Sequence, residues 1–142
     1  ELTEMYGVFD YVRMDVEGHE VQILQNVADL MDKGGKGINI IFETHINVYS
    51  EKQDIRSALM RLSRHGYKVE MVASSSDRGT QILKGFNSVP IKRIRTDEVY
   101  RTIHKDITMD QLLRCLEITG GIRTVFLSHN DVKTDNSGND LS

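Results

Sequence analysis

The chain has 142 residues, of which 39% are hydrophobic and 27% are charged, and its net charge is −3. This length and composition are ordinary for a single soluble globular domain, and the mild negative charge argues against a protein that binds nucleic acid by neutralising phosphates. The single cysteine, Cys115, excludes an internal disulfide, and no apolar run is long enough to span a membrane. Without a signal-peptide pattern, the expected location is cytoplasmic, with neither a membrane nor a nucleic-acid partner.

The first recognisable unit is a strand, a tight turn and a helix. A short apolar run over residues 11–14 ends at Asp15, as a buried strand does when it reaches the edge of a sheet. Residues 16–18 are predicted to turn, with Gly18 allowing the tight bend into the helix. Residues 19–31 then place apolar side chains at three- and four-residue steps, which predicts an amphipathic helix.

Polar side chains gather at this turn. In open α/β sheets, ligands bind outside the carboxyl ends of the strands, so Asp15, Glu17 and His19 lie where chemistry is expected. The alternative is that Asp15 and Glu17 only satisfy the free N–H groups and the positive end of the following helix. His19 is expected to be an exposed residue of the first helical turn.

A second strand brings two more candidates to the same edge. Residues 37–43 form an apolar run that predicts a central parallel strand, since the connection from the first strand contains a helix. Alternate residues of an extended segment point the same way, so Glu43 and His45 are expected to converge. Neighbouring strands lie under ~5 Å apart, which would bring Glu43 close to Asp15.

Two kinds of chemistry fit these side chains. A histidine could act as a general base on an acceptor hydroxyl, because its ordinary pKa suits neutral pH. Alternatively, Asp15, Glu43 and His45 could hold a divalent metal that orients the hydroxyl. The metal hypothesis has less support because the spacing matches no compact ligand motif. A third interpretation makes His45 a loop histidine bonded to backbone.

The remaining elements are predicted from periodicity and turn residues. They are a helix over 51–65 capped by Ser50, a strand over 67–73, a loop over 74–79, a short helix over 97–104, a helix capped by Asp106 or Thr108 that runs to 119, and a strand over 122–127. Cys115 is expected in the core on the apolar side of the last helix. Residues 130–142 are polar and predicted to be disordered, which leaves 1–129 as a single α/β domain.

Two blocks of sequence resemble a known family. The run Tyr-Val-Arg-Met-Asp-Val-Glu-Gly-His-Glu-Val-Gln-Ile-Leu over residues 11–24 resembles the hydrophobic-Lys-hydrophobic-Asp-Val-Glu-Gly-x-Glu-x-x-hydrophobic-Leu signature of FkbM-type methyltransferases. The run Ile-Ile-Phe-Glu-Thr-His over residues 40–45 is similar to the family's next strand, which ends in Glu-x-His. A helix and a strand start at residues 66–69 follow in the family's order, so the resemblance covers residues 8–73.

The resemblance implies a particular fold. The expected class is α/β, with a Rossmann-like three-layer sheet of the class I methyltransferase type, of which only the C-terminal half is present. This sheet would be mostly parallel with an antiparallel edge strand. The family's last two strands form an antiparallel pair at the sheet edge, and the strands over 67–73 and 122–127 would take these places. Residues 74–121 would then be a long insertion between the last two strands.

The resemblance also implies an activity, which is S-adenosylmethionine-dependent methyl transfer to an oxygen of a small molecule or sugar. The implied catalytic residues are Asp15, Glu17, Glu43 and His45, and the implied cofactor-binding residues are Asp15, Val16, Glu17 and Gly18. No G-x-G-x-x-G occurs, and the glycines at 34–37 follow a helix and act as its stop. The chain is therefore predicted to be a fragment without the glycine-rich cofactor loop, or a natural half-domain.

A competing hypothesis makes the chain a non-catalytic α/β scaffold or oligomerisation module derived from the same fold. Half of a doubly wound sheet leaves the edge of its first strand unpaired, and such an edge favours association. This edge is therefore a candidate surface for forming a homo-oligomer. The chain would be an enzyme only if the N-terminal half of the domain is supplied.

Overall fold

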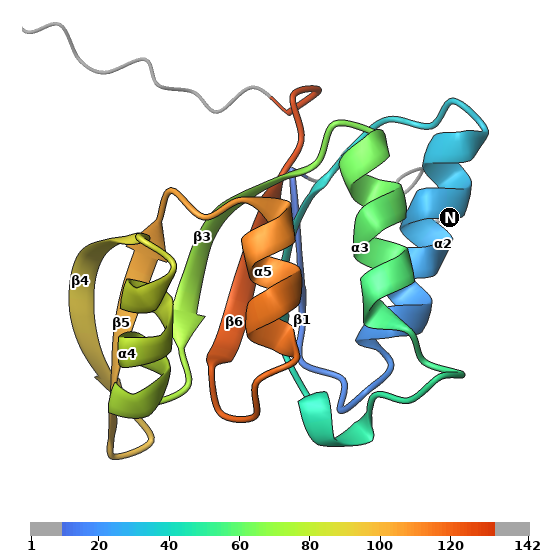
Figure 1. Ribbon diagram of the computed structural model, residues 1–142. Coiled ribbons are helices and arrows are strands. Elements are labelled where there is room, and N and C mark those ends of the chain that lie inside the picture. The colour runs from blue at the N-terminus through green and yellow to red at the C-terminus, as the bar shows by residue number, and fades with distance from the viewer. Residues whose placement is uncertain (1–9, 133–142) are drawn as a thin grey trace, which may run out of the picture.

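A single mixed sheet with helices packed on it makes up residues 10–132, the part of the chain that the computed structural model describes (Figure 1). Its first half contains β1 (Tyr11–Met14), α2 (Glu20–Asp32), β2 (Asn39–Glu43), the 3-10 turn η1 (Ile46–Val48) and α3 (Ile55–Arg64). Its second half contains β3 (Lys68–Ser74), α4 (Asp77–Gly85), β4 (Val89–Thr96), β5 (Val99–Lys105), α5 (Met109–Leu116) and β6 (Ile122–Ser128). The predicted α/β class is therefore confirmed.

The direction of the strands differs from the prediction. The order across the sheet is β1-β2-β6-β3-β5-β4. Only β1 and β2 pair in parallel, and every other pairing within the described residues is antiparallel. The prediction of a mostly parallel sheet is therefore wrong. Strands β2, β3 and β4 do run the same way, but β6 returns between β2 and β3, and β5 returns between β3 and β4.

The antiparallel pair of β3 and β6 is present, but it lies inside the sheet. Residues 74–121 lie between β3 and β6 in the chain, and the hairpin of β4 and β5 that they contribute extends the sheet beyond β3. The short helix predicted over 97–104 is wrong, because Asp97 and Glu98 form a two-residue turn with positive φ values of 50° and 62°. Such a turn matches the twist of a hairpin.

The four helices of the described chain lie on one face of the sheet (Figure 1). Each helix connects two strands that run in the same direction, and the right-handed rule for such crossovers puts all of them on the same side. A row of side chains across the sheet faces these helices and is buried: Met14, Phe42, Val125, Val72 and His104. No helix within residues 10–132 covers the opposite face. This part of the chain is therefore two-layered, and the predicted three layers are wrong for it.

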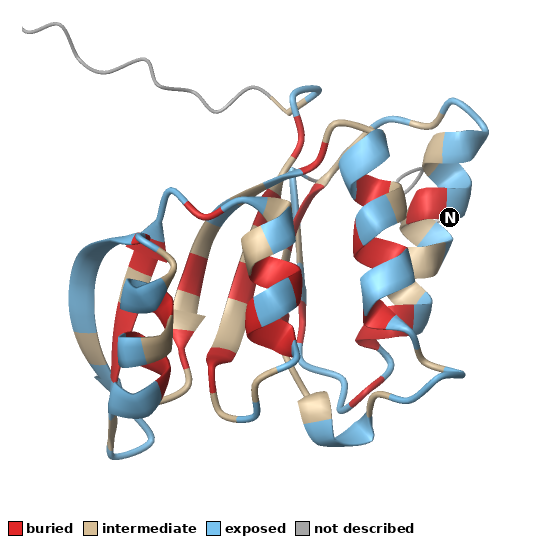
Figure 2. Cartoon of the chain, in the orientation of Figure 1, coloured by how far each residue is buried: buried red, intermediate tan, exposed pale blue. Residues whose placement is uncertain are grey.

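The side chains on the opposite face are only partly buried. Ile41, Phe126 and Met71 are aligned by the strand register and are half-buried. Figure 2 shows buried and intermediate segments alternating along the strands. The three side chains line an apolar groove together with Ile103. The first strand, β1, is at an edge and pairs only with β2 among the described residues, and the side chain of Tyr11 is exposed.

Local signals explain how the helices begin. The predicted cap at Ser50 is wrong, because Asp54 caps α3 by accepting a hydrogen bond from Ser57 N at 3.2 Å. The predicted cap at Thr108 is confirmed by a capping box with Gln111. The loop predicted over 74–79 is wrong, because α4 already begins at Asp77.

One histidine of the core has a defined tautomer. Ser88 Oγ donates its only proton to Leu83 O at 2.7 Å, so it accepts from His104 Nδ1–H at 2.9 Å. The Nε2 lone pair of His104 is then buried without a partner in the described structure. Burial lowers the pKa of His104, and the nearby charge of Lys84 lowers it further.

Cys115 is fully buried on the inner side of α5, as expected, and burial raises the pKa of its thiol to about 11. Of the predicted disordered tail, residues 130–132 form a turn in which Val132 N donates to His129 O. Residues 133–142 lie outside the described part. No helix in residues 10–132 combines the length and hydropathy that crossing a membrane requires.

Candidate active site at the carboxyl ends of β1 and β2

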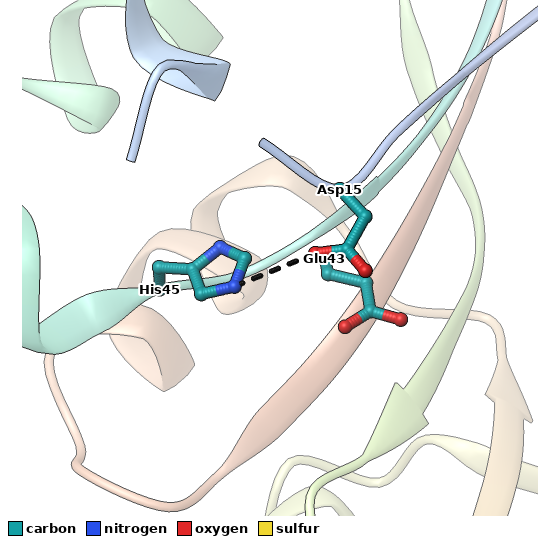
Figure 3. A group of neighbouring side chains, drawn as sticks. All are labelled: Asp15, Glu43 and His45. Atoms are coloured by element: carbon teal, nitrogen blue, oxygen red, sulfur yellow. Dashed lines mark ion pairs between the residues drawn. The ribbon is translucent and has the colours of Figure 1, made fainter. Parts of the chain in front are cut away.

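The structure brings Asp15, Glu43 and His45 together at one rim of the sheet (Figure 3). The parallel register pairs Met14 with Phe42, so Asp15 and Glu43 are the next residues along two neighbouring strands. One oxygen of each acid and one ring nitrogen of His45 all lie within 4.8 Å of one another. The distance from His45 Nε2 to Asp15 Oδ1 is 3.6 Å.

Glu20, which the sequence reasoning did not select, holds this site together. It is the first residue of α2 and its side chain is 0% exposed. Its Oε2 accepts from Gly18 N at 2.8 Å, and its Oε1 lies 3.4 Å from Val16 N and 2.6 Å from His45 Nδ1. The signal that could have identified it is the glutamate in the Gly-x-Glu part of the family signature.

The contact with Glu20 defines the orientation of His45. A buried carboxylate is an acceptor, so His45 Nδ1–H donates to it, and in the neutral imidazole the lone pair is on Nε2. That nitrogen faces Asp15, whose side chain is 53% exposed. The backbone N–H of His45 donates to the hydroxyl of Tyr49 at 3.0 Å, and burial raises the pKa of Tyr49 to about 12. Tyr49 therefore stays a neutral phenol that supports the loop.

Two N–H groups of the turn over residues 15–18 are satisfied by Glu20. The side chain of Glu20, rather than that of Asp15 or Glu17, accepts from Val16 N and Gly18 N, so the two acids do not make these hydrogen bonds. Glu17 is exposed, with φ at 47°, and makes none of the hydrogen bonds or ion pairs found in the described residues. It does not join Asp15 and Glu43. His19 is exposed, as expected.

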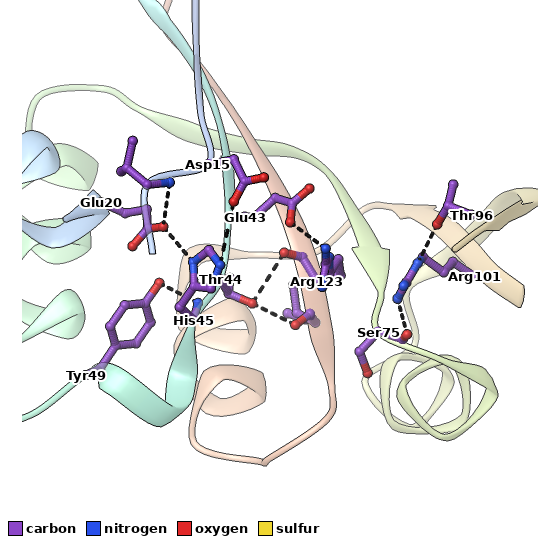
Figure 4. A network of polar contacts seen from close by, with 12 residues as sticks. Asp15, Glu20, Glu43, Thr44, His45, Tyr49, Ser75, Thr96, Arg101 and Arg123 are labelled. Carbon is purple, nitrogen blue, oxygen red and sulfur yellow. Dashed lines mark hydrogen bonds and ion pairs between the residues drawn. The ribbon is translucent and has the colours of Figure 1, made fainter. Parts of the chain in front are cut away.

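A residue from the far end of the chain completes the rim. Arg123, near the start of β6, lies with Nη2 at 2.8 Å from Glu43 Oε2 (Figure 4). The pair is an ion pair and is not aligned as a hydrogen bond. Thr44 fastens the two strand ends, because its Oγ1 donates to Ile122 O at 2.7 Å and its N–H donates to Arg123 O.

Asp15, Glu43 and His45 could supply three ligands to a divalent cation. The Glu20 contact to His45 Nδ1 is the carboxylate–histidine arrangement that often orients a metal-binding imidazole. However, the guanidinium of Arg123 already compensates the charge of Glu43, and it would repel a second cation at that oxygen. Asp15, Glu43 and His45 therefore fit a histidine base with polar neighbours better than a metal centre.

A cavity of about 420 Å³ opens beside His45. It lies between the loop that follows β2 and the loop that precedes β6, and both His45 and Arg123 line it. Its size is within the range of small-molecule sites, roughly 300–1,000 Å³. The site therefore has a histidine with an oriented lone pair, a carboxylate rim and space for a small ligand.

A parallel β–α–β unit with polar residues at the carboxyl ends of its strands is the arrangement at which open α/β sheets bind ligands. Residues 2–69 match the family model of the methyltransferase FkbM domain. This match confirms the resemblance found in the sequence and identifies this part of the chain as FkbM-type methyltransferase sequence. Comparisons with curated proteins and with solved structures give no significant match.

Proposed function

We propose that the chain forms the acceptor side of an S-adenosylmethionine-dependent methyltransferase that modifies a hydroxyl oxygen of a small molecule or sugar. The observation that carries the proposal is the array of Glu20, His45 and Asp15, which lies within the segment that matches the FkbM domain. In this proposal His45 is the general base. Asp15 and Glu43 form the negative rim at which the donor and acceptor meet.

His45 has the geometry of a base whose partner nitrogen is anchored. Its Nε2 would accept the acceptor's hydroxyl proton as the oxygen attacks the methyl group, and the sulfur of the donor would leave with the C–S electron pair. Glu20 would stabilise the imidazolium that forms, as a buried carboxylate does in other histidine-containing catalytic arrays. The donor, when bound, supplies a methyl group made electrophilic by a positively charged sulfur.

The chain's own residues fit part of a donor site. Asp15 has an exposed carboxylate at the strand end, where an acid can bind ribose hydroxyls or face a positive charge. The N–H groups of Val16 and Gly18 point to Glu20 instead, which leaves them unavailable to a ligand. The glycine-rich turn of such enzymes is not found in this sequence, so in this proposal a further segment supplies it.

One observation favours a second candidate, a non-catalytic scaffold or oligomerisation module. Within the described residues β1 has an open edge, and an apolar groove that includes Ile41, Phe126 and Met71 is covered by no helix. Open edges and apolar surfaces of this kind favour association. The scaffold hypothesis predicts a concentration-dependent oligomer and no affinity for S-adenosylmethionine.

The test is a calorimetric titration of the protein, as its gene encodes it, with S-adenosylmethionine, followed by a methyl-transfer assay of His45→Gln. We expect binding in both forms and a kcat lowered about 100-fold or more in the variant. His65→Gln is the matched control, because His65 is also paired with a carboxylate, Asp32, but lies at the far end of α3. Full activity of His45→Gln would contradict the role of the base. Absence of binding, with an intact fold and an oligomer, would favour the scaffold.

A further inference from the structure

The chemistry of the cavity beside His45 restricts the ligand that it can take. The polar residues that line it include Arg123, Asn47, Thr119 and His45. No carboxylate lines it within the described residues. Glu43, the partner of Arg123, is 15% exposed and is not part of the wall. Among the lining residues the formal charge is therefore that of Arg123, which Glu43 compensates from outside the wall.

Two further hydroxyls of the wall are already in use. Thr44 Oγ1 donates to Ile122 O, and Ser75 Oγ donates to Gly120 O. The first bond ties the loop after β2 to the start of β6, and the second ties the segment after β3 to the loop before β6. The side-chain donors left for a ligand, among the described lining residues, are those of Asn47, Thr119 and Arg123.

Arg123 is prepared to bind an anion. Its side chain is 40% exposed, its Nη2 lies 2.8 Å from Glu43 Oε2, and the hydrogen bonds found among the described residues include none from its guanidinium. A guanidinium held on one side by a carboxylate loses less side-chain freedom when it binds a second group. Two parallel N–H groups match the oxygens of a carboxylate or phosphate.

We propose that this cavity binds the methyl acceptor through an oxyanion, so that the acceptor is a small hydroxylated carboxylate or phosphate ester. The anion lies on Arg123, and one hydroxyl of the same molecule lies at His45 Nε2. The proposal rests on the proposed function, since it assumes that His45 receives the acceptor's proton. It narrows the acceptor from any small molecule or sugar to an anionic one.

The test is an amide NMR titration of the protein without the methyl donor, using four sugars of similar size. The probes are glucuronate, glucose 6-phosphate, glucose and glucosamine, which differ in the charge that they carry. We expect glucuronate or glucose 6-phosphate to shift signals of residues 44–48 and 119–123 and to bind at least about tenfold more tightly than glucose. Whichever of glucuronate and glucose 6-phosphate binds more tightly identifies the preferred anion as a carboxylate or a phosphate. We expect glucosamine to bind least.

Variants of Arg123 separate charge from shape. Arg123→Gln should lose the preference for the anionic sugar, about tenfold, while its affinity for glucose stays the same. Arg123→Lys keeps the charge and should retain part of the preference. Arg56→Gln is the matched control, because Arg56 also forms an exposed ion pair with a glutamate, Glu117, but lies outside the cavity. It should bind all four sugars as the unmodified protein does.

Equal affinity for glucose and glucuronate, shifts that lie outside the cavity loops, or no binding by any of the probes would each overturn the proposal. Because the donor is absent from this titration, the result is independent of methyl transfer. Anion binding at Arg123 without any methyl transfer would contradict the proposed function. Methyl transfer to neutral acceptors alone would contradict only the inference about the anion.

Discussion

Replacing Glu20 by glutamine keeps the shape of the side chain but removes its charge and one of its two acceptors. Oε1 lies 2.6 Å from His45 Nδ1 and 3.4 Å from Val16 N, and Oε2 lies 2.8 Å from Gly18 N. An amide has one oxygen and one NH2 group. In either orientation the NH2 group therefore faces a donor that previously had an acceptor.

The cost follows from the burial of Glu20, which is 0% exposed. A buried donor left without a partner costs about 1–3 kcal/mol, and a hydrogen bond to a charged group contributes about 1.5–3 kcal/mol. Since His45 can recover one contact by moving its proton from Nδ1 to Nε2, we expect a loss of about 2–4 kcal/mol in the free energy of unfolding. The same proton movement removes the Nε2 lone pair, so methyl transfer should fall as well.

Urea unfolding followed by far-ultraviolet circular dichroism measures this loss, because the sequence has no tryptophan to report by fluorescence. For a domain of this size the expected loss lowers Tm by roughly 5–15 °C. Glu17→Gln is the control, since Glu17 is exposed in the same turn, and its substitution should change stability by less than about 0.5 kcal/mol. The reasoning is refuted if Glu20→Gln has the same urea midpoint as the unmodified protein. It is also refuted if Glu17→Gln is destabilised as much as Glu20→Gln.

Three further predictions concern other parts of the fold. Gly18→Ala should destabilise the protein by at least about 1 kcal/mol more than Gly34→Ala, because both glycines have positive φ but only at Gly18 would a Cβ meet Val48, at 2.6 Å. Equal urea midpoints for the two variants would contradict that contact. Because burial lowers the pKa of His104 in the folded state, the stability it contributes is complete above about pH 6.5 and is lost as the pH falls below that value. Urea midpoints measured between about pH 7.5 and 5 should fall in the unmodified protein and fall less in His104→Asn, which keeps an N–H for the same bond; equal slopes would show that His104 is not responsible. The Cys115 thiol, whose pKa burial raises to about 11, should react with a disulfide reagent at least about 100-fold more slowly in the native than in the urea-unfolded protein, and equal rates would contradict its burial.

Features that depend on neighbouring residues in the chain could be predicted. The strand before Asp15 and the two helices that follow β1 and β2 were visible as apolar periodicity, and the parallel pairing of β1 with β2 followed from the helix between them. The helix predicted over 97–104 is wrong at the β4–β5 turn, because Asp97 and Glu98 lack the glycine that usually marks a two-residue hairpin turn. The serines at 74–76 have the composition of a loop, although α4 begins immediately after them.

The site shows the same division. Asp15, Glu43 and His45 could be placed at one rim, because they lie at or just after the ends of the two strands of a single β–α–β unit. The part played by Glu20 was missed, since a charged residue at a helix start usually faces water, and here the turn of Gly18 folds over it. Arg123 carried no signal, because it reaches Glu43 only through the pairing of β6 with β2.

The sequence by itself determined the α/β class, the strand–turn–helix around Asp15 and the FkbM-type relationship, because these depend on spacing within short segments. The tertiary structure decided that β6 returns between β2 and β3, that Glu20 orients His45, and that Arg123 reaches the site. Strand pairing joins residues far apart in the chain, and an apolar strand can pair with any of several partners at similar cost. Which pairing forms depends on how the helices pack on the whole sheet, and a local pattern does not contain that information.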